Sequence, residues 1–192
     1  MSGQPRLFLV RHGETEGAAS GRHTGWTDIP LNDRGRRQAK QLKERLDEET
    51  FALVVSSPLS RALETCHLVG LGDRAIVDPD LREWDYGAYE GLTTDKIRED
   101  VPGWTIWSDR VRDGERIAEV AARLDRVIER SLAADGDVAL FAHGHALRIL
   151  AARWIEMPPA HGRHLTLDTA STSVLGWERD TRVICRLNIS PW

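Results

Sequence analysis

Short apolar runs alternate with longer segments of helical periodicity along most of the chain. Apolar residues fill short runs, as in strands, at 7–10, 53–55, 75–77 and 138–142, and the run at 7–10 is typical of a buried strand. Between these runs, apolar residues recur at every third or fourth position in segments at about 32–49, 60–66, 115–134 and 145–157. Two further strand-like stretches are joined as a predicted hairpin, at 173–178 and 182–188.

Strands that alternate with helices predict an α/β fold of three layers, in which a mostly parallel central sheet carries helices on both faces. The length and the lack of linkers favour a single domain over residues 1–192. Residues 81–114 show no clear period, and we expect them to form an irregular insertion that shapes one wall of a ligand site. Ligands of such folds bind at the carboxyl ends of the strands.

Composition and charge narrow the function classes. Hydrophobic residues make up 41% of the chain and charged residues 29%, which is typical of a globular protein. The formal net charge of -4 offers no general attraction for nucleic acid, so a bound anion must be held by local positive charge. Two distant cysteines and the lack of a long apolar run predict a cytoplasmic protein that does not act at a membrane.

Two predicted strands end in a histidine that is followed by glycine. Arg11 and His12 follow the first strand, and His143 follows the last parallel one, so these side chains are expected to share one crevice. Arg61 lies just past the second strand. Two guanidinium groups grip phosphoryl oxygens well, and an imidazole can attack phosphorus. We therefore predict that His12 is the nucleophile of a phosphoryl-transfer site and that His143 donates to a phosphoryl oxygen.

The leaving alcohol of such a reaction needs a proton, which a carboxylic acid usually supplies. We predict that Glu83 is this acid, because Trp84 beside it would help to exclude water. Asp85 and Glu90 are also candidates for the same role. Since Glu83 must hold a proton while His12 stays neutral, we expect an acidic to neutral pH optimum.

The motif Arg11-His12-Gly13 and four later stretches resemble the histidine phosphatase superfamily, also called the phosphoglycerate mutase-like family. The matching stretches are 11–15, 24–31, 56–62, 81–92 and 141–145. The resemblance implies a phosphoglycerate mutase-like fold, a phosphohistidine on His12 and no metal or other cofactor. It also implies a phosphate pocket of Arg11, Arg61 and His143, with Glu83 as the proton donor. Within the family the chain is most similar to broad-specificity acid phosphatases and sedoheptulose-1,7-bisphosphatases, which act on small phosphate esters.

Several further residues are assigned to the site. We predict that Thr24 and Gly144 help to bind phosphate, and that the substrate contacts Tyr86, Gly25 and Trp107. His145 is expected to cap a helix or to make a supporting hydrogen bond. Ala18 stands where relatives carry a hydrogen-bonding residue, so one phosphate donor is missing or replaced, and the effect of Arg116 is left open.

The preferred function is hydrolysis of small phosphate monoesters, with sugar phosphates as the expected substrates and no nucleic acid or membrane partner. A phosphoglycerate mutase is a second hypothesis, although Ser108 and Asp109 replace the arginine pair of true mutases. A third hypothesis is a metal-dependent hydrolase with His12, His143 and His145 as ligands, and a fourth is a phosphate-binding module without catalysis. The sequence leaves the oligomeric state open, and a homodimer is compatible with it.

Overall fold

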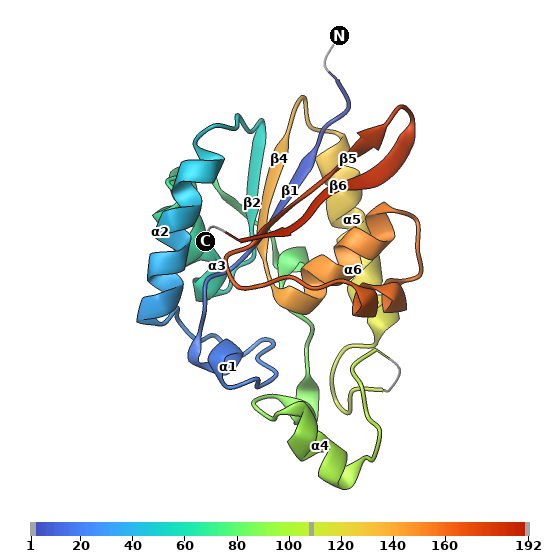
Figure 1. The fold of residues 1–192 in the computed structure, drawn as a ribbon. Coiled ribbons are helices and arrows are strands. Elements are labelled where there is room, and N and C mark those ends of the chain that lie inside the picture. Colours follow the sequence, from blue (N-terminus) through green and yellow to red (C-terminus); the bar gives the residue numbers. More distant parts are fainter. Residues whose placement is uncertain (1–2, 108–109, 191–192) are drawn as a thin grey trace.

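The computed structural model describes residues 3–107 and 110–190. Its sheet has the strand order β3-β2-β4-β1-β5-β6 (Figure 1). The strands are β1 (Leu7–Arg11), β2 (Leu53–Ser56), β3 (Ile76–Val77), β4 (Val138–Ala142), β5 (Thr172–Glu178) and β6 (Thr181–Ile189). Strands β1 to β4 run parallel, whereas β5 pairs antiparallel with both β1 and β6. The predicted α/β class with a mostly parallel sheet is confirmed.

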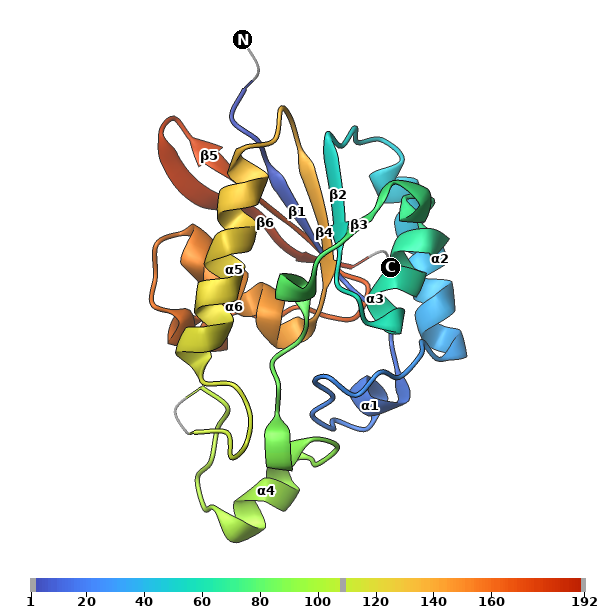
Figure 2. The same cartoon turned by 180° about the vertical axis from the view of Figure 1, so that it is seen from behind.

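Helices cover both faces of this sheet (Figures 1 and 2). The helices α2 (Asp33–Leu46) and α3 (Ser60–Leu68) pack on one face, and α5 (Ile117–Leu132) and α6 (Gly144–Trp154) pack on the other. Along β1 the side chains alternate between the two cores: Leu7 and Leu9 join the α5 and α6 side, while Phe8 and Val10 join the α2 and α3 side. Fully apolar strands are expected for a sheet that is buried on both faces.

Two short helices do not follow from the sequence pattern. The loop after β1 contains α1 (Glu16–Ala19), whose cap is the Thr15 side chain, and residues 81–114 contain α4 (Thr94–Asp100), capped by Thr93. Helices of one or two turns are too short to show a readable period. Both lie at the end of the molecule where β1 and β4 terminate (Figure 1). The segment expected to be irregular therefore has partly regular structure.

The remaining regular structure consists of short 3₁₀ turns, which are η1 (Gly72–Arg74), η2 (Pro79–Leu81), η3 (Gly87–Tyr89) and η4 (Pro159–His164). Both cysteines are free thiols, with Cys66 buried and Cys185 exposed. Within 3–107 and 110–190, no helix is both long and apolar enough to cross a membrane.

Candidate active site

A cavity lies at the carboxyl ends of β1 and β4. Four arginines and one glutamate line the cavity, so the local positive charge that an anionic ligand requires is present. The lining residues are Arg11, His12, Thr15, Ala18, Arg22, His23, Thr24, Arg61, Glu83, Tyr86, Gly144, His145, Arg148 and Leu167.

His12 follows the last residue of β1, and its ring is held in one tautomer. The Nδ1 atom lies 2.7 Å from the carbonyl oxygen of Gly13. Because a carbonyl can only accept, Nδ1 carries the proton and Nε2 keeps its lone pair. Burial, followed by the charges of Arg61 and Arg11, holds the pKa of His12 well below its usual value of about 6.5. The ring is therefore neutral near pH 7 and has the form that a nucleophile needs.

Arg61 occupies the second position of α3 and is almost completely buried. Its Nη1 donates to the carbonyl of Thr27 at 3.0 Å, and its Nη2 donates to the carbonyl of Gly25 at 2.7 Å. Its Nε donates to Nδ1 of His143 at 3.2 Å. These bonds fix the plane of the guanidinium group at the inner end of the cavity.

His143 is completely buried behind the cavity surface, with its ring centroid 5.2 Å from that of His12. Since Nε of Arg61 always carries a proton, Nδ1 of His143 accepts, and the proton of the neutral ring resides on Nε2. That Nε2 donates to Oγ of Ser57 at 2.8 Å. Burial and then the Arg61 charge keep the pKa of His143 well below its usual value. The predicted donation to a phosphoryl oxygen requires this Nε2–H to turn away from Ser57.

Arg11 ends β1 and is held from one side only. Its Nη1 donates to the carbonyl of Leu167, while its Nε is buried without a hydrogen-bond partner among the residues that the structure describes. An unpaired buried N–H costs free energy, so this side of Arg11 is less firmly held than the side that bonds to Leu167. Gly144 allows this arrangement, since a Cβ there would lie 3.3 Å from Cζ of Arg11. The predicted pocket residues Thr24 and Gly144 both line the cavity with Arg11.

Glu83 is the only one of the three candidate acids that lines the cavity. Its Oε1 accepts from the backbone N–H of Trp84 and Ala146, and its Oε2 accepts from the N–H of His145 at 3.0 Å. The carboxyl group of Glu83 is thus fixed at the N-terminus of α6, beside the cavity.

The other two candidate acids, Asp85 and Glu90, accept hydrogen bonds from backbone N–H groups and do not line the cavity. Oδ1 of Asp85 accepts from the N–H of Gly87, and Oε1 of Glu90 accepts from the N–H groups of Gly25 and Thr27. Both carboxylates therefore stabilise turns of the chain around the cavity.

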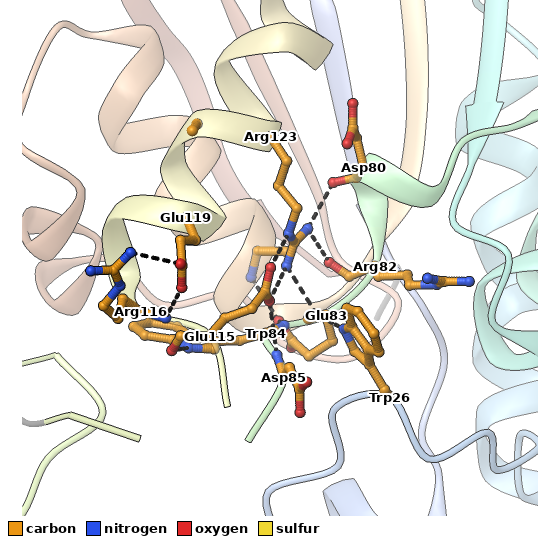
Figure 3. Close-up of polar contacts among 12 residues, drawn as sticks. Trp26, Asp80, Arg82, Glu83, Trp84, Asp85, Glu115, Arg116, Glu119 and Arg123 are labelled. Carbon is orange, nitrogen blue, oxygen red and sulfur yellow. Dashed lines mark hydrogen bonds and ion pairs between the residues drawn. The ribbon is translucent and has the colours of Figure 1, made fainter. Parts of the chain in front are cut away.

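Arg123 supports the Glu83 segment, and the sequence pattern alone does not identify it. From α5 its Nη1 donates to the carbonyl of Arg82 at 2.6 Å and its Nη2 donates to the carbonyl of Glu83 at 3.0 Å (Figure 3). An ion pair at 2.9 Å with the partly buried Glu115 holds the guanidinium group in place. Glu115 in turn accepts from the backbone N–H of Asp85 at 3.0 Å. An arginine among the buried apolar positions of α5 is the one sequence signal of this role.

The residues predicted to contact substrate differ in whether they line the cavity. Tyr86 lines the cavity, whereas Gly25 and Trp107 are not among the lining residues. Gly25 supplies a carbonyl to Arg61, and the Trp107 ring packs against His145 with a centroid distance of 5.3 Å.

His145 also lines the cavity, and its Nδ1 lies 2.6 Å from the hydroxyl of Tyr86. Burial holds the pKa of His145 well below, and that of Tyr86 well above, its usual value. The two side chains therefore form a neutral hydrogen-bonded pair, which agrees with the supporting role expected for His145.

The departures from the family pattern have partial explanations. Ala18 lines the cavity from α1, with Thr24 as a hydroxyl-bearing neighbour in the same lining. Arg116 is the N-cap residue of α5, and its backbone N–H donates to Glu119 at 2.8 Å. Ser108 and Asp109 lie outside the described residues.

The hypothesis of a metal site finds no arrangement of ligands to support it among residues 3–107 and 110–190. Within the described part of the chain, no group of three or more histidine, cysteine, aspartate or glutamate side chains is placed to hold a metal ion. Both ring nitrogens of His143 already have hydrogen-bond partners, and so does one ring nitrogen of His145.

Several known proteins are similar to this chain over most of its length. An acid phosphatase of Mycobacterium tuberculosis is 39% identical over 189 residues, which cover 96% of this chain and 93% of that protein. The sedoheptulose 1,7-bisphosphatase of Saccharomyces cerevisiae is 38% identical over 183 residues, with 78% of this chain and 67% of that protein covered. A solved structure of an open reading frame product from Mycobacterium tuberculosis superimposes with a TM-score of 0.93 and 40% identity, covering 98% of this chain and 99% of that one.

These relatives confirm the resemblance to acid phosphatases and sedoheptulose bisphosphatases. A family model described as the histidine phosphatase superfamily (branch 1) matches residues 7–190. The chain is therefore a member of the histidine phosphatase superfamily.

Proposed function

We propose that the chain hydrolyses small phosphate monoesters, sugar phosphates among them, without a metal ion and through a phosphohistidine intermediate on His12. The observation that carries this proposal is the unprotonated Nε2 of His12 in a cavity that Arg11 and Arg61 also line. A neutral imidazole beside two fixed guanidinium groups suits attack on a phosphoryl group, whose oxygens those groups would bind.

In the first step, Nε2 of His12 attacks phosphorus and the bond between phosphorus and the ester oxygen breaks. Glu83 gives its proton to that oxygen, so the leaving group departs as a neutral alcohol. Nδ1–H of His12 keeps its bond to the carbonyl of Gly13, which stabilises the positive charge of the phosphorylated ring.

In the second step, a water molecule attacks the phosphoryl group on His12. Glu83 takes a proton from this water, and the bond between phosphorus and Nε2 breaks, which releases phosphate and restores the neutral ring. One carboxylate thus acts as the acid and then as the base. Its attachment to the first N–H groups of α6 keeps it at one position for both steps.

The names of the relatives support the substrate class. One relative is named an acid phosphatase and another a sedoheptulose 1,7-bisphosphatase, that is, an enzyme for a small sugar ester.

The proposal is tested by measuring phosphate release from p-nitrophenyl phosphate and from sugar phosphates with excess chelator present. We expect full activity with chelator and a loss of about a thousand-fold or more in kcat for the folded His12→Asn variant. Activity that chelator abolishes and a metal restores would overturn the metal-independent mechanism. Interconversion of phosphoglycerates without net phosphate release would identify a mutase instead.

A further inference from the structure

The backbone carbonyl of Glu83 accepts two side-chain hydrogen bonds, which come from different parts of the chain. Nη2 of Arg123 donates to it from α5 at 3.0 Å, and Nε1 of Trp26 also donates to it at 3.0 Å (Figure 3). A carbonyl oxygen has two lone pairs, so these two donors satisfy it. The peptide group of the proposed acid is therefore held both by α5 and by the loop between α1 and α2 that contains Trp26.

The Trp26 side chain belongs to neither hydrophobic core. It is 44% exposed, and it is the only exposed tryptophan among residues 3–107 and 110–190. The guanidinium carbon of Arg82 lies 4.9 Å from the centre of its ring. Since Arg82 directly precedes Glu83, both of these contacts connect the ring to the segment of the proposed acid. Core packing therefore does not account for the position of Trp26, whereas its contacts with this segment do.

The residues on either side of Trp26 hold Arg61. The carbonyl of Gly25 accepts from Nη2 of Arg61 at 2.7 Å, and the carbonyl of Thr27 accepts from Nη1 at 3.0 Å. Arg61 is 1% exposed and is one of the two arginines proposed to bind the phosphoryl group. One short loop thus contacts the phosphate-binding arginine through its backbone and the segment of the acid through the Trp26 side chain.

The loop itself has a fixed shape. Oε1 of Glu90 accepts from the N–H groups of both Gly25 and Thr27. Gly25 also lies against the segment of the proposed acid, because a Cβ at this position would clash with the carbonyl oxygen of Trp84. Supporting contacts of this kind keep the indole N–H of Trp26 in one place.

We propose that Trp26 is a positioning residue, which keeps Glu83 at a fixed position relative to Arg61. Trp26 does not line the cavity, so it acts through Glu83 and does not touch the ester. A phosphate held by Arg61 presents its ester oxygen at one place, and the proton must be delivered there for the alcohol to leave. The inference rests on the proposed phosphatase activity and adds Trp26 to the residues on which proton donation depends.

Trp26→Phe tests this role, because phenylalanine keeps an aromatic ring beside Arg82 and removes the N–H that reaches Glu83. The measured quantity is kcat/KM, which depends only on the steps up to departure of the first leaving group. For a sugar phosphate that the wild-type protein hydrolyses, such as glucose 6-phosphate, we expect kcat/KM to fall about five-fold, as for the loss of one ordinary hydrogen bond. For p-nitrophenyl phosphate, whose leaving group departs without a proton, the loss should be less than about two-fold.

Trp177→Phe is the matched control. Nε1 of Trp177 likewise donates to a backbone carbonyl, that of Pro5 at 3.1 Å, and the guanidinium carbon of Arg182 lies 5.6 Å from the centre of its ring. Trp177 lies on β5 and does not line the cavity. This control should leave kcat/KM unchanged for both esters.

Three further measurements separate positioning from a general structural effect. In a Glu83→Gln background no acid remains to be positioned, so Trp26→Phe should slow both esters by the same factor. The inhibition constant of inorganic phosphate should change by less than about two-fold in Trp26→Phe, because Arg61 keeps its carbonyl partners. Arg82→Gln removes the guanidinium group from the Trp26 ring, so it should also slow the sugar phosphate more than p-nitrophenyl phosphate, and it carries the test if Trp26→Phe does not fold.

Equal losses for the two esters in Trp26→Phe would overturn the positioning role, and so would the same ester-selective loss in Trp177→Phe. A selective loss that persists in the Glu83→Gln background would overturn it too. A larger inhibition constant of phosphate would do the same, because the effect would then lie at Arg61. Failure of the wild-type protein to release phosphate from either ester would instead overturn the proposed phosphatase activity.

Discussion

Nη2 of Arg123 donates to the backbone carbonyl of Glu83 across 3.0 Å, so a buried arginine outside the cavity fixes the residue that we propose as the acid. The carboxylate of Glu83 then bonds to the first N–H groups of α6. This links α5, the Glu83 segment and α6 in one chain of contacts. The position of the proposed acid therefore depends on a residue that does not line the cavity.

The first prediction concerns Arg123→Met. The variant should lower kcat by about ten-fold and the free energy of unfolding by about 3 kcal/mol, because it leaves Glu115 and several carbonyls without a buried partner. Steady-state kinetics and denaturant titration measure the two effects. Arg126→Met is the control, since Arg126 is 53% exposed and bonds to Asp80 and to its own helix. Equal effects of the two substitutions would refute the positioning role.

The second prediction concerns Glu83→Gln, which removes the proposed proton donor. A poor leaving group such as a sugar alcohol needs the proton, so kcat for sugar phosphates should fall by about a hundred-fold or more. p-Nitrophenolate leaves without a proton, so the loss for p-nitrophenyl phosphate should be much smaller. Asp85→Asn is the matched control, because Asp85 stabilises a neighbouring turn. An equal loss for both esters in Glu83→Gln would argue against the acid role.

The third prediction concerns the pH dependence of kcat/KM. Since the pKa of the neutral nucleophile His12 lies well below 6.5, lowering the pH from 7 to about 6.5 should not cost activity through its protonation. Arg11→Gln removes a positive charge beside His12, which raises the pKa of His12 and shifts the acid limb to higher pH. Both proteins are measured with the same ester, so the ionisation of the substrate affects both pH profiles of kcat/KM equally and drops out of the comparison. An acid limb that does not move in the variant would contradict this assignment.

The sequence predicts the sheet and its main helices because their burial patterns are regular. Apolar strands and the period of α2 and α5 follow from one sheet covered on both faces. His12 and Arg11 are predicted for a related reason, since the carboxyl ends of parallel strands meet at one edge.

Several features depend on contacts between distant segments, which no local pattern records. Arg123 lies within a helical segment, and it contacts the backbone of Glu83, which is 40 residues earlier in the sequence. The bond between His143 and Ser57 is likewise a long-range contact, and it leaves His143 behind the cavity surface. The number of cavity arginines becomes visible only when the fold brings Arg22 and Arg148 together.

Trapping the phosphorylated enzyme tests the central claim most directly. Wild-type protein is mixed with a radiolabelled phosphate ester for a single turnover and denatured at alkaline pH, and the labelled peptide is mapped. We predict that the label resides on His12 and is absent from the folded His12→Asn variant. Label on another residue, or the same labelling in the variant, would contradict the account.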